Sequence, residues 1–239
     1  MAAFARALAV GADGIETDVR LTADGKVVVF HDEHAARIAG VRRSVSLCAL
    51  REVQSWDVGH GFEGAGGRRP FAGAGHRAPT LADVLEQFPH TCFNVDLKPR
   101  GRSIVEAAIR TVRALGAEDR VLLTSFHGDT VRAVRAQGYG GPTGSATVDV
   151  LRLLARPLAS LAPGAHPAHA VQVPFRAGPW SLPFAHVLAR CRAVGARLDV
   201  FTINEPSIAQ RVAAEGADGI MTDDPARIAV ALGRAPAGP

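Results

Sequence analysis

The chain has 239 residues, of which 47% are hydrophobic, and its formal net charge is +4. This length fits one α/β barrel, so we expect a single domain over residues 1–239. The sequence contains no run of about twenty apolar residues, which argues against a transmembrane segment. The arginines are scattered and only 5% of the residues are aromatic, so nucleic acid is not an expected partner.

The first residues, MAAFARALAVGADG, are unlike a signal peptide, because an arginine interrupts their apolar part and a strand pattern follows directly. We therefore expect a cytoplasmic protein. The three cysteines, Cys48, Cys92 and Cys191, are odd in number and lack metal-like spacing. The sequence thus predicts neither a disulfide framework nor a zinc site.

Short runs rich in β-branched residues alternate with longer amphipathic segments, a pattern typical of βα units and a parallel sheet. The predicted strands cover residues 14–19, 27–31, 91–98, 121–126, 141–146, 170–174, 198–203 and 219–223. The predicted helices include residues 103–115, 130–137, 184–194 and 206–215. The fold class expected from this alternation is α/β.

One phrase occurs twice: GADGIETD at residues 11–18 returns as GADGIMTD at residues 216–223. Each copy follows a helical segment and leads into a short strand, so its glycines and first aspartate have the chemistry of a loop between helix and strand. Such recurrence is expected when equivalent units surround one barrel axis. The two copies differ only at Glu16 and Met221.

The connection between the first two predicted strands, residues 20–26, is too short for a parallel crossover, so these strands should form an antiparallel hairpin. If Asp24 and Gly25 form the centre of a type I′ turn, Asp18 lies opposite His31. A register shifted by two residues would place Glu16 there instead. In either register, Glu16, Asp18 and His31 share one face.

Two carboxylates on one strand face repel each other unless a positive charge lies near them, and a hard divalent cation would supply it. Glu16 and Asp18 stand in this relation, and Asp96 of the segment FNVDLK is a third candidate ligand on a face shared with Lys98. Oxygen ligands favour Mg²⁺ or Ca²⁺, and a lysine can contact a phosphate. The alternatives are solvated surface carboxylates and a structural histidine.

Several segments together resemble the glycerophosphodiester phosphodiesterase family. The stretch GADGIETDVRLTADGKVVVFHD is similar to the family signature of a Glu-x-Asp strand, a T-x-D-G turn and a His-Asp ending. Further similar segments follow in order: APTLADVL, NVDLK, LLTSF, DVFTINEP and GADGIMTDDP. The resemblance covers almost the whole chain.

The resemblance implies a (β/α)₈ TIM barrel that hydrolyses glycerophosphodiesters to sn-glycerol 3-phosphate and an alcohol at the carboxyl ends of its strands. It also implies that the substrate's own glycerol hydroxyl attacks phosphorus, assisted by a divalent metal, Mg²⁺ or Ca²⁺, and by two histidines. The implied metal ligands are Glu16, Asp18 and Asp96; Lys98 contacts the phosphate, and His31 is one catalytic histidine.

Two positions depart from the family pattern. Asp96 stands where many members have glutamate, and Phe201 replaces a tryptophan, which keeps an aromatic wall for the substrate but removes its N–H donor. Members of the family also begin with a His-Arg-Gly strand, whereas this sequence opens in the helix that follows. We therefore expect the barrel to lack its first strand.

Two explanations of that departure stay open: the coding sequence starts upstream, or the chain is a truncated and catalytically impaired barrel. A further alternative is a phospholipase D-like lyase that acts on other phosphodiesters. The sequence indicates neither the alcohol of the substrate nor the oligomeric state.

Overall fold

The computed structural model describes residues 1–177, 180–181 and 183–234. Parallel strands form its centre in two sheets. The first contains β1 (Gly14–Leu21), β3 (Cys92–Leu97) and β4 (Val121–Thr124), and the second contains β5 (Ala170–Pro174), β8 (Arg197–Phe201) and β9 (Gly219–Ile220). The parallel bridges Leu123↔Thr143 and Gly144↔Ala170 join the two sheets through residues 141–146. The result is one continuous parallel ladder.

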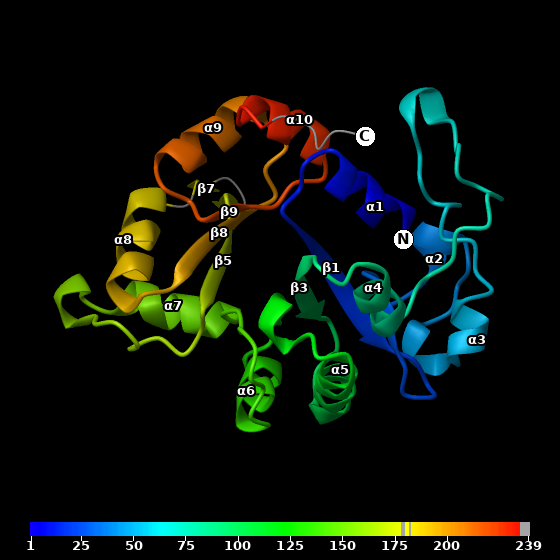
Figure 1. The fold of residues 1–239 in the computed structure, drawn as a ribbon, viewed down its shortest axis with the longest axis horizontal. Coiled ribbons are helices and arrows are strands. Elements are labelled where there is room, and N and C mark those ends of the chain that lie inside the picture. Colours follow the sequence, from blue (N-terminus) through cyan, green and yellow to red (C-terminus); the bar gives the residue numbers. More distant parts are fainter. Residues whose placement is uncertain (178–179, 182, 235–239) are drawn as a thin grey trace.

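Helices surround this ladder on its outer side (Figure 1). Outward-facing valines, leucines and phenylalanines of the strands pack against the apolar faces of these helices in two core clusters, one for each sheet. The arrangement is that of a TIM barrel, as the sequence predicts. The helices are α1 (Ala2–Ala9), α4 (Leu81–Gln87), α5 (Arg102–Ala114), α6 (Gly128–Ala136), α7 (Thr147–Ala155), α8 (Phe184–Val194), α9 (Pro206–Ala214) and α10 (Pro225–Ala231).

The inward face of the ladder is polar, because every second residue of the same strands points into the barrel. Register pairs Glu16 with Asn94, and Asp18 with Asp96 and so with Thr124. Parallel partners point to the same side, so the acidic residues of β1 and β3 are brought together by sheet register. This is the constraint that builds the site.

The hairpin between β1 and β2 (Val27–Val29) differs from its predicted register. Val19 pairs with Val29 and Leu21 with Val27, so Asp18 lies opposite Phe30, whose N–H donates to the Asp18 carbonyl. The turn contains three residues rather than two, with Gly25 in the left-handed region at φ 73°. The prediction that His31 lies opposite Asp18 or Glu16 was therefore wrong: β2 ends before His31.

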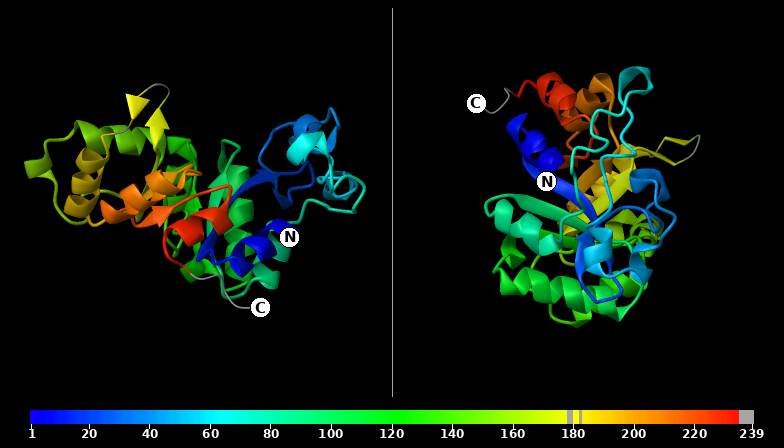
Figure 2. Two further views of the ribbon diagram at one scale, coloured as in Figure 1. Left: turned by 90° about the horizontal axis from the view of Figure 1, so that it is seen from above. Right: turned by 90° about the vertical axis from the view of Figure 1, so that its right-hand side faces the viewer.

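Residues 30–80 form an excursion beside the barrel (Figure 2). They contain α2 (Ala36–Ala39) and α3 (Leu50–Val53), with short 3₁₀ turns at Val45–Leu47 and Ala65–Gly67. A third cluster of buried side chains, including Phe30 and Trp56, gives this segment its own core. The sequence pattern predicted no elements here.

Most predicted strands and helices are confirmed to within a few residues. The segment 141–146 contributes bridges instead of a strand, and the two-stranded hairpin of β6 (Arg176–Ala177) and β7 (Trp180–Ser181) was not predicted. In the part of the chain that the structure describes, β1 and β9 are not hydrogen-bonded partners. The single domain over residues 1–239 stays a prediction. Within the described residues, every helix is too short or too polar to cross a membrane.

Gly144 fills a position where the barrel interior has no room for a side chain. A Cβ there would lie 2.3 Å from Oγ1 of Thr124, whereas a Cβ at Gly140 would make only ordinary contacts. We expect Gly144→Ala to lower the free energy of unfolding by about 1–3 kcal/mol, because side chains must shift to relieve the overlap. Gly140→Ala is the control. Equal urea midpoints for the two variants would contradict this account.

Candidate functional site

Lys98 lies between two carboxylates at the carboxyl ends of β1 and β3. Its Nζ is 2.7 Å from Oδ1 of Asp18 and 2.8 Å from Oδ2 of Asp96. The backbone holds this arrangement in place, since the Lys98 N–H donates to the carbonyl of Val19. The ammonium thus offsets the repulsion between the two aspartates.

Glu16 lies two residues before Asp18 on β1, and its register partner on β3 is Asn94. Burial, followed by the negative charges of Asp18 and Asp96, raises the pKa of the Glu16 carboxyl to about 8, against the lowering effect of Lys98. The side chain can still reach solvent through the open mouth. The inner face of the barrel is concave, so the Glu16 carboxyl is exposed to solvent and still has many protein atoms around it. Without an added cation, a pKa of about 8 favours the protonated form of this carboxyl at neutral pH.

Asp96 is almost fully buried, with a relative exposure of 4%. Burial raises the pKa of its carboxyl, while the hydrogen bond and charge of Lys98 lower it. Its Oδ1 accepts no hydrogen bond from any residue that the structure describes. A buried carboxylate oxygen without a donor is costly, and a cation would satisfy it.

The donors fit a hard divalent cation in their chemistry, because all three predicted ligands are carboxylates. Their present arrangement does not form a finished site. Within residues 1–177, 180–181 and 183–234, no three histidine, cysteine, aspartate or glutamate side chains meet in a geometry that could hold a metal ion. The Lys98 ammonium stands between two of the three carboxylates instead.

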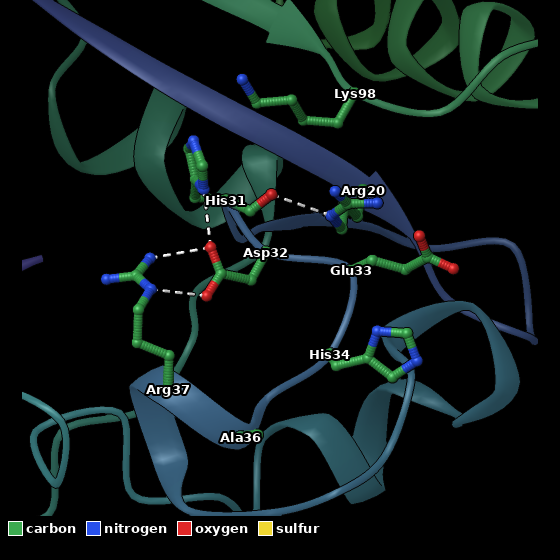
Figure 3. A pocket seen from close by; sticks show the side chains of 8 residues that line it. All are labelled: Arg20, His31, Asp32, Glu33, His34, Ala36, Arg37 and Lys98. Carbon is green, nitrogen blue, oxygen red and sulfur yellow. Dashed lines mark hydrogen bonds and ion pairs between the residues drawn. The ribbon is translucent and has the colours of Figure 1, made fainter.

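His31 follows β2 and lies on the wall of a cavity of about 460 Å³ that Lys98 also lines (Figure 3). Its Nδ1 is 2.7 Å from Oδ1 of Asp32. Arg37 donates to both oxygens of Asp32, from Nε and Nη2, at 2.7 Å each. These bonds to Arg37, followed by the bond to His31, lower the pKa of Asp32 to about 2. The chain Arg37–Asp32–His31 therefore fixes the imidazole beside the cavity.

Phe201 is connected to the charged cluster through Phe126. The two rings pack edge to face with centroids 6.1 Å apart, and the Lys98 Nζ lies 5.4 Å from the Phe126 ring centre. Phe201 also lines a second cavity of about 390 Å³ with Pro174, Ile203 and Ile208 among its walls. An aromatic wall thus borders the site, and half of Phe126 is exposed.

The structure adds residues that sequence reasoning did not single out: Arg20, Arg37, Phe126, Asn204 and Asp223. Asn204 donates from Nδ2 to Oδ2 of Asp223 at 2.9 Å, and the charge of Asp223 contributes to the raised pKa of Glu16. The repeated phrase held the signal for Asp223, because it occupies the same place in the second copy as Asp18 does in the first.

Known proteins resemble this chain over most of its length. The model of the glycerophosphoryl diester phosphodiesterase family matches residues 1–227. YqiK of Bacillus subtilis is 31% identical over 97% of this chain and 91% of its own length, and a glycerophosphodiester phosphodiesterase of Caldanaerobacter subterraneus is 30% identical over 94% and 88%.

Solved structures share the fold. A phosphodiesterase of Oleispira antarctica, in complex with the product sn-glycerol-3-phosphate, has a TM-score of 0.76 at 21% identity, covering 97% of this chain and 89% of that one. The family model, the relatives and the shared barrel lead to one conclusion: the chain belongs to the glycerophosphoryl diester phosphodiesterase family, whose members are phosphoric diester hydrolases.

Proposed function

We propose that this protein hydrolyses glycerophosphodiesters to sn-glycerol 3-phosphate and an alcohol. The observation that carries the proposal is the shared cavity, in which a histidine held by a carboxylate lies beside a lysine next to an acidic cluster. This cavity offers a proton-transfer group and a positive charge to one bound phosphodiester. The family membership supports the same reaction. A cytoplasmic location stays a prediction from the sequence.

In this proposal Glu16, Asp18 and Asp96 hold a divalent cation, Mg²⁺ or Ca²⁺. Such a cation would supply positive charge to stabilise negative charge that develops on the phosphate oxygens. The unsatisfied Oδ1 of Asp96 and the shared inward face of the three carboxylates support this assignment.

His31 carries one of the proton transfers. With Nδ1–H donating to Asp32, its Nε2 is free to accept the proton of the attacking glycerol hydroxyl or, once protonated, to give one to the leaving alcohol. Asp32 stays charged throughout the neutral range, because its pKa lies at about 2. The imidazole therefore keeps one orientation during turnover.

Lys98 contacts a phosphate oxygen, and Phe201 with Phe126 forms the apolar border that limits water around the bound diester. The Lys98 ammonium is already within reach of the cavity. Its two aspartate partners orient it, so little side-chain freedom is lost when a phosphate binds.

The reaction can be followed by phosphorus NMR of glycerophosphocholine incubated with the protein and either Mg²⁺ or Ca²⁺. We expect the diester signal to be replaced by that of glycerol 3-phosphate. A persistent cyclic phosphate would indicate a lyase instead, and an unchanged diester signal would indicate a barrel without this activity.

His31→Ala should lower kcat by about 10²–10⁴, because a positioned proton-transfer group contributes that much. His90→Ala, which removes an exposed histidine before β3, is the matched control. Calorimetry should show that His31→Ala leaves cation affinity unchanged. If affinity fell together with turnover, His31 would be a metal ligand and its proposed role would be wrong.

Chelation with EDTA should abolish turnover, and adding back Mg²⁺ or Ca²⁺ in turn should identify the cation that restores it. Asp96→Asn should weaken cation binding at least tenfold by calorimetry, because the buried site loses a charged ligand. Asp119→Asn, at an exposed carboxylate on the outside of the barrel, is the control. Full activity in EDTA would refute the metal assignment.

A further inference from the structure

Arg20 lies near the end of β1 and lines the same cavity as His31 and Lys98 (Figure 3). Its Nε donates to the carbonyl oxygen of His31 at 3.0 Å. The other two nitrogens of the guanidinium, Nη1 and Nη2, donate to no residue that the structure describes. The reaction proposed above gives these two groups no role.

The other strong cations of the cavity are matched by carboxylates. Lys98 is paired with Asp18 and Asp96, and Arg37 with Asp32. In contrast, no carboxylate of the described chain lies within 4.0 Å of the Arg20 guanidinium. Arg20 is also half-buried. A partly desolvated charge without a partner is unfavourable, and a bound anion would offset that cost.

We propose that Arg20 binds a second anionic group of the substrate, carried by its alcohol portion, while Lys98 faces the phosphate that reacts. The substrate class is then a glycerophosphodiester whose alcohol bears a further phosphate or phosphodiester. This inference rests on the proposed hydrolase function. Two parallel guanidinium N–H groups match two phosphate oxygens, and a cavity of about 460 Å³ has room for both groups.

Glu33 is the group that opposes such binding. It is exposed, lines the same cavity and acts on Arg20 through its charge, yet it lies beyond ion-pair distance. Asp32 is already paired with Arg37 and hydrogen-bonded to His31. Removing the charge of Glu33 should therefore strengthen the attraction between Arg20 and an anion.

Two substrates differ by one glycerophosphate group: glycerophosphoglycerol has one phosphodiester, and bis(glycerophospho)glycerol has two. The measured quantity is the ratio of kcat/KM for the second substrate to that for the first, with the cation present. We expect Arg20→Gln to lower this ratio at least tenfold and Glu33→Gln to raise it. Arg110→Gln removes an exposed arginine on the outside of α5 and should not change it.

An unchanged ratio in Arg20→Gln would overturn the inference, whether both rates fell together or neither fell. So would an equal change in Arg110→Gln, because the effect would then reflect net charge alone. Calorimetric binding of bis(glycerophospho)glycerol to His31→Ala protein, with and without Arg20→Gln, separates this inference from the reaction. A tenfold loss of affinity supports the anion site even if no diester is hydrolysed, and equal affinities contradict it.

Discussion

The repulsion among acidic side chains at the carboxyl ends of β1 and β3 is the interaction around which the site is organised. Parallel register places Asp18 beside Asp96 and Glu16 beside Asn94, so the fold itself forces the carboxylates together. Lys98 relieves part of this repulsion by bridging two of them. Burial and the remaining repulsion raise the pKa of Glu16, and Oδ1 of Asp96 accepts no hydrogen bond from the described residues.

The other charged residues of the cavity form separate groups with different proposed roles. Asp32 and Arg37 satisfy each other and leave His31 oriented, so that the proton-transfer group does not depend on the acidic cluster for its position. Lys98 belongs to the cluster, and Arg20 to neither group. A substrate with two anionic groups would meet two cations held by different parts of the structure, the loop after β3 and the end of β1.

Alternation along the chain was enough to predict a parallel α/β fold, the shared strand face of Glu16 and Asp18 and the approximate bounds of α5, α6, α8 and α9, because periodicity depends on the sequence locally. The barrel was expected from the family resemblance. The position of His31 was not predictable in this way. It depends on whether the turn before β2 has two residues or three, and Asp24 does not adopt the left-handed conformation that a two-residue type I′ turn requires of both its residues. The ion pairs of Asp32 and Arg37 belong to the excursion after β2, whose fold has no periodic pattern to reveal it. The sequence of residues 141–146 predicts a strand, but the segment forms only isolated bridges, at Thr143 and Gly144.

The geometry gives a physical reason for the single difference between GADGIETD and GADGIMTD. Asp18 and Asp223 hold equivalent places, but the first is paired with Lys98 and the second accepts a hydrogen bond from Asn204. At the differing position, Glu16 is the register partner of Asn94, and the sulfur of Met221 lies 4.0 Å from Nδ2 of the same Asn94. A second glutamate at Met221 would add another carboxylate to an interior where burial and neighbouring carboxylates already raise the pKa of Glu16 to about 8. The neutral Met221 side chain avoids this additional repulsion.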